Sequence, residues 1–139
     1  LFESSNDQSC MLKIVGQGYS VLIPGDIERP VEEYLLQGEK GMLKADLLIA
    51  PHHGSNTSST SGFINAVQPD QVVFTAGYQD RFGHPTEAVI KRYQVRQVEM
   101  LNSSLTGSIE YDFIATDKMP NPRTYRNEYK AYWRLSDGG

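Results

Sequence analysis

The stretch Leu47-Leu48-Ile49-Ala50-Pro51-His52-His53-Gly54 joins an apolar, strand-like run to a turn that carries two histidines. Two other apolar runs, residues 21–23 and 72–74, lead into turns that carry Asp26 and His84. The segments between the runs are long enough for crossover helices, so the strands are predicted to be parallel, with their carboxyl ends at one sheet edge. Ligands bind at that edge in α/β proteins. The sequence therefore predicts an α/β fold that gathers one acid and all three histidines of the chain.

Periodicity and turn signals predict the remaining elements. Residues 10–15 and 19–23 flank Gly16-Gln17-Gly18, which is typical of a tight β-hairpin. The Ser/Thr-rich loop 55–61 offers hydroxyls that can cap a following helix, and Thr86 can cap a later one. Amphipathic helices are expected at 30–37, 62–67 and 86–92, and closing strands at 97–101 and 107–113.

Composition limits the possible functions. A chain of 139 residues fits one domain or part of a larger one, and no apolar run approaches the roughly 20 residues that span a bilayer. The formal net charge of −4 argues against a generic nucleic-acid clamp, although bound divalent cations would reverse the local sign. The single cysteine, Cys10, excludes an internal disulfide, and its apolar surroundings predict a buried structural thiol. Because the chain opens at Leu1 without a signal peptide, it is expected to be a fragment starting within a longer protein.

Asp26 follows a Pro-Gly turn at a predicted strand end. A carboxylate in this position can bridge two metal ions through its two oxygens. It can equally cap the helix that follows, and the turn alone favours neither interpretation.

The histidines differ in how strongly they indicate a site. His52 and His53 are adjacent at the end of a buried strand, where neighbouring side chains point in different directions, so packing does not explain the pair. One imidazole can bind a metal while the other faces a substrate oxygen, and Gly54 lets the backbone pass close to a ligand. His84 by itself is better explained as a solvent-facing histidine in a Gly-Pro loop. It gains significance from its predicted place beside the other two.

Several motifs carry a family resemblance. Three segments resemble the C-terminal half of the metallo-β-lactamase-type domain of the ComEC competence proteins, the DNA-uptake channel family. They are residues 22–28, 43–55 and 81–85, which contain Gly25-Asp26, Pro51-His52-His53-Gly54-Ser55 and Gly83-His84-Pro85. Residues 6–13 and 106–109 are similar to the same family. The resemblance covers about residues 6–113, with the motifs in the family's order and at its separations.

The resemblance implies an αββα sandwich, of which this chain is half, with a mixed sheet, flanking helices and a site for two divalent metal ions, Zn or Mn. It places the bridging ligand on Asp26 and a terminal ligand on His53. His52 and His84 would act as catalytic residues that contact the phosphate or protonate the leaving group, and Ser55 and His84 would bind substrate. The family's His-x-His-x-Asp-His signature is absent here and is expected upstream of Leu1. The isolated chain is therefore expected to hold an incomplete metal site and to be inactive.

For the parent protein the resemblance implies a metal-dependent phosphodiesterase or nuclease that acts on DNA during competence-related uptake. The expected partners are the N-terminal half of the same domain, the membrane channel portion of the parent protein, and DNA, with the oligomeric state open. The domain would lie on the external or periplasmic side of an inner membrane. Two alternatives remain: a hydrolase of another phosphoester or a thioester, and a non-catalytic DNA-binding or scaffold module.

The chain is expected to divide into residues 1–117, the half domain, and residues 118–139, a partly helical tail. The tail interleaves basic and aromatic residues, which suits a surface for single-stranded DNA: Arg123, Tyr125, Arg126, Tyr129, Lys130, Tyr132, Trp133 and Arg134. Its tyrosines also recur at helical spacing, so a helix that docks its aromatic face on the domain is the favoured interpretation.

Overall fold

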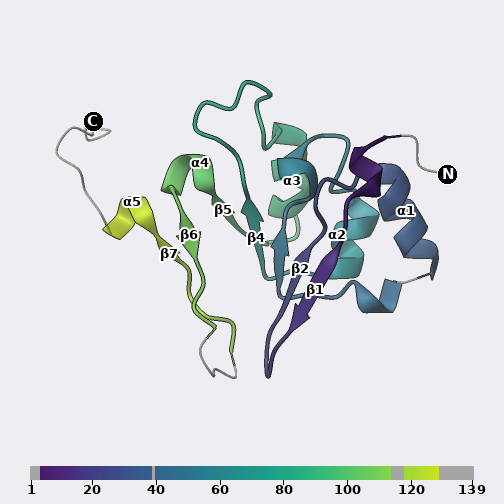
Figure 1. Ribbon diagram of the computed structural model, residues 1–139, viewed down its shortest axis with the longest axis horizontal. Coiled ribbons are helices and arrows are strands. Elements are labelled where there is room, and N and C mark those ends of the chain that lie inside the picture. The colour runs from purple at the N-terminus through teal and green to yellow at the C-terminus, as the bar shows by residue number, and fades with distance from the viewer. Residues whose placement is uncertain (1–3, 39, 114–117, 129–139) are drawn as a thin grey trace.

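The computed structural model describes residues 4–38, 40–113 and 118–128. A five-stranded sheet with the strand order β1-β2-β3-β4-β5 forms its centre (Figure 1). The strands are β1 (Leu12–Val15), β2 (Ser20–Ile23), β3 (Leu47–Ile49), β4 (Gln71–Phe74) and β5 (Glu99–Asn102). Among the described residues, no helix is long and apolar enough to cross a membrane.

The sheet is mixed. β1 and β2 form an antiparallel hairpin in which Leu12 lies opposite Ile23 and Ile14 opposite Val21. β2, β3, β4 and β5 are parallel to one another. The predicted hairpin and the predicted parallel strands are thus confirmed, and the carboxyl ends of β2, β3 and β4 lie at one edge of the sheet.

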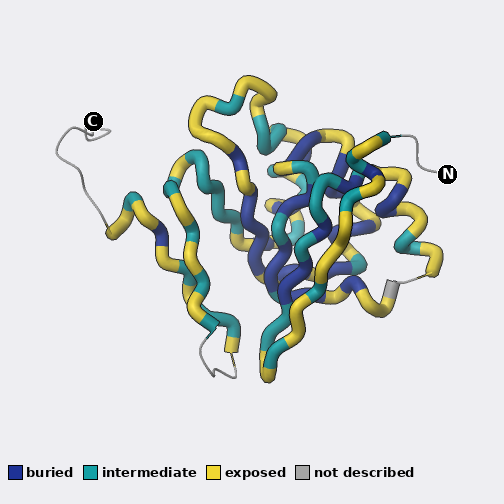
Figure 2. Tube along the Cα trace, viewed as in Figure 1, coloured by how far each residue is buried: buried dark blue, intermediate teal, exposed yellow. Residues whose placement is uncertain are grey.

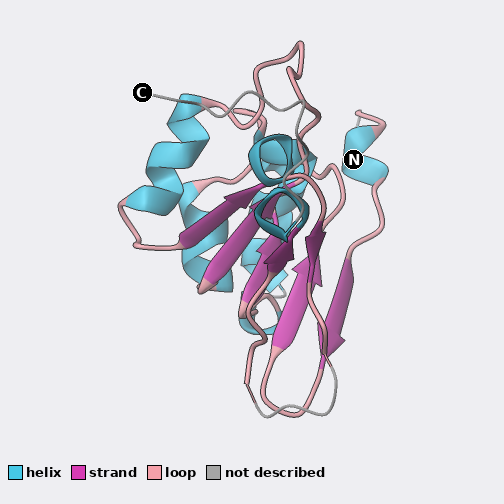
Figure 3. Cartoon of the chain, turned by 90° about the vertical axis from the view of Figure 1, so that its left-hand side faces the viewer, coloured by secondary structure: helices cyan, strands magenta, loops and turns pink. Residues whose placement is uncertain are grey.

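Three helices, α1 (Arg29–Gly38), α2 (Ser61–Val67) and α3 (Glu87–Gln94), cover one face of the sheet (Figures 1 and 3). Thr60 caps α2, because its hydroxyl accepts a hydrogen bond from the N–H of Phe63 at 3.2 Å. Thr86 holds the same position before α3, but its hydroxyl contacts the carbonyl of Gly54 instead.

The main core lies between these helices and the sheet, where Figure 2 shows the buried part of the chain. Its largest fully buried side chains come from α2 and α3, from the strands and from the loops between them: Leu22, Ile27, Leu43, Leu48, Phe63, Ile64, Phe74 and Tyr93. Alternate strand residues serve the two faces, since Leu22 belongs to this core and its neighbour Val21 to a smaller cluster on the other side.

The opposite face of the sheet has a thinner cover. Its cluster of Val21, Leu47 and Val73 packs against partly buried residues of a separate arm, among them Tyr111 and Phe113. In this arm β6 (Ile109–Glu110) pairs antiparallel with β7 (Arg123–Thr124), and Figure 1 shows the arm beside the sheet on the side away from the helices. One helical layer on one mixed sheet is consistent with half of an αββα sandwich.

Two predictions from the sequence need correction. Residues 107–113 do not close the main sheet; only Ile109 and Glu110 form a strand, and its partner is β7. Cys10 is exposed and not a buried structural thiol, because it precedes β1, which is the edge strand of the sheet. Tail residues 118–128 contain β7 and the short helix α5 (Tyr125–Glu128). Tyr125 of the predicted aromatic face lies in α5, whereas Tyr129 and Tyr132 lie outside the described residues.

Candidate functional site

A cavity of about 300 Å³ opens at the edge of the sheet where β2, β3 and β4 end. Its lining comes from strand-end turns and from the loop between β4 and α3: Asp26, His52, His53, Thr75, Ala76, Gly77, Asp80, Phe82 and His84. The ring centroids of His52 and His84 lie 5.9 Å apart, and those of His52 and His53 lie 6.4 Å apart. Asp26 and the three histidines, remote in the sequence, therefore share one cavity.

The two adjacent histidines stand on an unusual backbone. They lie in the short helical turn η3 (Pro51–Gly54), where the φ angles of His52 and His53 are 47° and 56°. This left-handed region costs a non-glycine residue about 1–3 kcal/mol and persists where the surroundings enforce it. One such restraint is the hydrogen bond from the N–H of His52 to the carbonyl of Gly25 at 3.1 Å, which ties the turn after β3 to the turn after β2.

Gly54 completes this turn at a position that only glycine fits. Its φ is +86°, and a Cβ atom there would lie 2.6 Å from Cβ of Pro85 and 2.8 Å from Cδ1 of Phe74. The carbonyl of Gly54 accepts a hydrogen bond from the N–H of Thr86 at 3.0 Å. The glycine therefore lets the loop that carries His84 pack directly on the turn that carries the other histidines.

His53 and Asp26 face each other across the cavity. Nε2 of His53 lies 3.6 Å from Oδ1 of Asp26, and both side chains are nearly half exposed. Two ligands of one tetrahedral ion, each about 2.0–2.1 Å from it, lie roughly 3.4 Å apart, so this pair fits a shared cation. Nδ1 of His53 lies 3.0 Å from the hydroxyl of Thr75, an arrangement that orients the ring and leaves Nε2 toward Asp26.

His52 is paired with a carboxylate that follows the same strand as Asp26. Its Nδ1 lies 3.1 Å from Oε1 of Glu28, and the hydroxyl of Thr57 is next to the same nitrogen at 3.4 Å. The Glu28 carboxylate also accepts a hydrogen bond from Asn6, and the N–H of Glu28 donates to Asp7. The N-terminal segment thus fixes the carboxylate that orients this imidazole.

His84 has a carboxylate partner from its own loop. Nδ1 of His84 lies 3.6 Å from Oδ2 of Asp80, which also accepts a hydrogen bond from the N–H of His84 at 2.9 Å. That backbone hydrogen bond is the main reason why the pKa of Asp80 is lowered. The His84 ring stacks on Phe82, with the ring centroids 5.8 Å apart and an angle of 21° between the ring planes. His84 therefore faces the cavity and is not simply a solvent-facing loop residue.

Ser55 is predicted to bind substrate, and this stays a prediction. It is buried, and its hydroxyl lies 3.1 Å from that of Thr57, which in turn is next to His52. It is absent from the cavity lining. The fully buried Ser58 supports the turn more directly, since its hydroxyl donates to the carbonyls of Pro51 and Ser55 at 2.8 and 3.0 Å.

A buried carboxylate holds the loop that follows the histidines. Glu32 on α1 is fully buried and accepts hydrogen bonds from the N–H groups of Ser59 and Thr60 at 2.6 and 2.8 Å. Arg92 donates to the carbonyl of Ser59, and the hydroxyl of Tyr93 donates to the hydroxyl of Ser59. Burial raises the pKa of Glu32, against the lowering effect of these hydrogen bonds and of Arg92.

Sequence reasoning missed three residues that orient the predicted ones: Glu28, Thr75 and Asp80. Spacing offers a signal for two of them. Glu28 stands two residues after Asp26, and Asp80 stands four residues before His84, a distance at which a carboxylate can accept a hydrogen bond within a turn. Thr75 follows β4 directly and belongs to the strand-end positions where ligands are expected.

Comparison of the sequence with known proteins identifies the family of the chain. No protein-family model matches the chain. The chain is 39% identical to the competence protein ComA of Neisseria gonorrhoeae over 129 residues, which are 93% of this chain and 18% of that protein. It is 31% identical to ComE operon protein 3 of Bacillus subtilis over 110 residues, 79% of this chain and 14% of that protein. The chain belongs to the ComEC competence-protein family.

A third relative, the uncharacterized protein YcaI of Escherichia coli, is 32% identical over 113 residues, 81% of this chain. The ComEC-family chain spans 14% to 18% of the length of the curated relatives it matches. Within the part that the structure describes, no group of three or more His, Cys, Asp or Glu side chains is arranged to hold a metal ion. Asp26 and His53 lie at a distance from each other that suits one shared ion.

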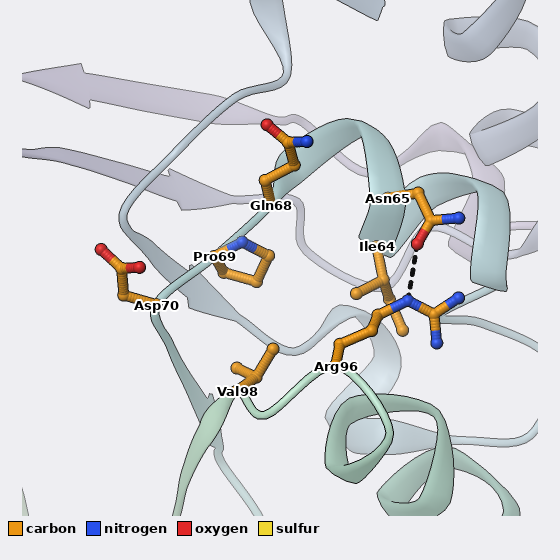
Figure 4. Close-up of a pocket in the computed structure, with 7 residues that line it drawn as sticks. All are labelled: Ile64, Asn65, Gln68, Pro69, Asp70, Arg96 and Val98. Carbon is orange, nitrogen blue, oxygen red and sulfur yellow. Dashed lines mark hydrogen bonds between the residues drawn. The ribbon is translucent and has the colours of Figure 1, made fainter.

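A second cavity of the ComEC-family chain, of about 410 Å³, lies at the other end of the strands, between the end of α2 and the starts of β4 and β5 (Figure 4). Arg96 spans it and donates to Asn65 Oδ1 at 2.6 Å, to the carbonyl of Arg92 at 2.6 Å and to that of Ser61 at 3.4 Å. These contacts join α3 to α2, so the guanidinium serves the packing of two helices.

Proposed function

We propose that this chain contributes half of a metal-dependent phosphodiesterase site that acts on DNA during competence-related uptake. The observation that supports the proposal best is that Asp26, His53, His52 and His84 line one cavity at the carboxyl edge of parallel strands. A carboxylate and imidazoles at such an edge suit divalent-metal and phosphate chemistry.

In this proposal Asp26 and His53 hold a divalent cation, Zn²⁺ or Mn²⁺, and residues of the parent protein outside the described segments complete a site for two ions. The 3.6 Å between Oδ1 and Nε2 suits one shared ion, and the contact with Thr75 orients His53 for that role. When bound, the ions supply charge neutralisation at the phosphate and activate water.

His52 and His84 handle protons at the scissile phosphate. Each has a carboxylate next to Nδ1, Glu28 for His52 and Asp80 for His84, so Nε2 is the nitrogen available to the substrate. A ring that carries protons on both nitrogens can donate the Nε2 proton to the leaving oxygen as its bond to phosphorus breaks, and the neutral ring that remains keeps its Nδ1 proton toward the carboxylate. The two rings are 5.9 Å apart, so one can donate while the other contacts a phosphate oxygen.

The assignment of DNA as substrate is supported by the names of the relatives, two of which are a competence protein and a ComE operon protein. The formal charge of −4 makes a nonspecific basic clamp a poor explanation for DNA binding by this chain. A metal-centred site removes this difficulty, since the cations reverse the sign of the potential where the phosphate sits.

The sheet face away from the helices is proposed to pack against the rest of the parent domain. Leu12 and Ile14 of β1 share this face with Ile23 and Val21, and they are 55% and 46% exposed. Apolar side chains on the open face of an edge strand favour a further layer above them.

The proposal is tested by hydrolysis of a labelled oligonucleotide by the whole parent protein supplied with Mn²⁺. Asp26→Ala and His53→Ala are each expected to reduce the rate of hydrolysis by a factor of about 100 or more, because each variant removes a proposed metal ligand. Asp112→Ala, which changes an exposed carboxylate in the arm, serves as the matched control and should keep full activity. Unchanged hydrolysis by Asp26→Ala would exclude the proposal.

A further inference from the structure

We propose that the loop between β4 and α3 is a stacking platform for single-stranded DNA that leads the strand into the cavity of the three histidines. The platform is defined by Tyr78, Arg81 and Phe82. This inference rests on the proposed function, because it takes DNA as the substrate class and adds the form of DNA and the residues that receive it.

The platform presents two aromatic rings to solvent. Tyr78 is 72% exposed and Phe82 is 64% exposed. Figure 1 shows the loop projecting beyond the helices and the sheet, and Figure 2 shows most of it as exposed. Two large rings on a projecting loop add nothing to the core of this chain, but each offers a π-face on which a nucleobase of any sequence can stack.

A guanidinium lies next to each ring. The Arg81 guanidinium is 4.6 Å from the centroid of Phe82, and that of Arg126 is 5.4 Å from the centroid of Tyr78. Arg126 is held in place by donating to the carbonyls of Ser104 and Leu105. Aromatic rings with neighbouring cations are the combination that binds single strands, since a guanidinium that leaves the ring for a phosphate frees the π-face for a base.

The platform is continuous with the proposed catalytic site. Phe82 and His84 both line the cavity, and their rings stack with centroids 5.8 Å apart. His84 in turn lies 5.9 Å from His52. A base stacked on Phe82 would therefore place the phosphate next to it within reach of the two imidazoles.

The distribution of charge around the platform favours DNA binding by base stacking over DNA binding by neutralisation of phosphates. Asp80 lies within the platform loop, but its carboxylate is directed to the backbone and ring of His84. Two arginines in a chain of net charge −4 make a weak clamp for duplex DNA, whose bases are already stacked on each other. The platform should therefore prefer single strands, and its affinity should depend less steeply on salt than that of a basic groove.

The test measures binding of a fluorescein-labelled 12-nucleotide oligo-dT, and of a duplex of equal length, to the 139-residue chain by fluorescence anisotropy. The double variant Tyr78→Ala, Phe82→Ala should bind the single strand at least about tenfold more weakly, because one stacked base contributes roughly 1–3 kcal/mol. Phe82→Trp should retain or strengthen binding. Tyr34→Ala, which changes another exposed aromatic on α1, is the control and should bind like the unaltered chain.

Thermal unfolding verifies that each variant is folded. Every variant is expected to fold, because the substituted side chains are exposed. Several results would overturn the platform: no binding of the single strand by the unaltered chain, equal binding by the double variant, or equal losses for single strand and duplex. The outcome is separable from that of the proposed function, which is read from hydrolysis by the parent protein. If the single strand binds through the loop but the parent protein does not hydrolyse DNA, the platform is supported and the phosphodiesterase proposal is refuted. If the parent protein hydrolyses DNA but the double variant binds the single strand as well as the unaltered chain does, the phosphodiesterase proposal is supported and the platform is refuted.

Discussion

The Nδ1 atom of His52 lies 3.1 Å from Oε1 of Glu28, although the two residues follow different strands. Glu28 follows β2 and His52 follows β3, and the parallel pairing of these strands brings their carboxyl ends together. A carboxylate in this place fixes the tautomer and the orientation of an imidazole.

Glu28→Gln should therefore reduce hydrolysis by the parent protein about 10- to 100-fold, with most of the loss in kcat, because the amide orients His52 less firmly. Steady-state kinetics with the oligonucleotide substrate provide the measurement. Glu33→Gln, at an exposed position of α1, should have no effect. Equal kcat values for Glu28→Gln and the unaltered protein would show that this contact has no part in catalysis.

Gly54→Ala should lower the free energy of unfolding by about 2 kcal/mol or more, because the new Cβ atom meets Pro85 and Phe74 at a left-handed φ. Urea unfolding followed by circular dichroism measures the change. Gly77→Ala is the matched control in the neighbouring strand-end turn, where a Cβ atom has nothing within 4 Å. A Gly54→Ala variant as stable as Gly77→Ala would contradict the packing described here.

Titration of Glu32 should lower the free energy of unfolding of the chain as the pH rises. Burial raises the pKa of this carboxyl above its ordinary value of 4.5, so the folded chain keeps the proton to a higher pH than the unfolded chain. This contribution to the free energy of unfolding is complete below pH 4.5 and is lost as the pH rises through the folded pKa.

Urea unfolding at several pH values therefore tests the burial of Glu32. Glu32→Gln removes the titration, so its stability relative to the unaltered chain should improve as the pH rises above 4.5. Glu33→Gln should differ from the unaltered chain by a constant amount. A constant difference for Glu32→Gln as well would contradict the raised pKa.

The sequence was informative about the sheet because the relevant signals are local. Runs such as 47–49 and 72–74 are apolar and end in turn residues, and parallel pairing then dictates that their carboxyl ends meet. This reasoning placed Asp26, His52, His53 and His84 at one edge before any distance was known. It did not require knowledge of any side-chain conformation.

The predictions from the sequence were wrong where long-range contacts determine the structure. The two-residue pairing of β6 with β7 joins residues 109–110 to 123–124 across a long connection, and neither strand is long enough to show a periodicity. Cys10 was misjudged because an apolar run does not reveal that its strand lies at the edge of the sheet. The role of Ser55 at the substrate stays a prediction, and its hydroxyl lies 3.1 Å from that of Thr57.

The open face of the sheet yields a further prediction. Ile14→Ser should make this domain of the parent protein about tenfold more sensitive to proteolysis, since a buried aliphatic side chain contributes about 1.5–3 kcal/mol. Val15→Ser, which alters the adjacent, more exposed residue on the other face of β1, should have little effect. Equal sensitivity of the two variants would indicate that no layer covers this face.

The central claim, that Asp26 and His53 share a divalent cation, is tested most directly by calorimetric titration of the 139-residue chain with Zn²⁺ and with Mn²⁺. We predict weak binding that is lost in both Asp26→Ala and His53→Ala but retained in His84→Ala, because two ligands do not make a closed site. Tight binding of two ions by the isolated chain, or binding that survives Asp26→Ala, would contradict the account.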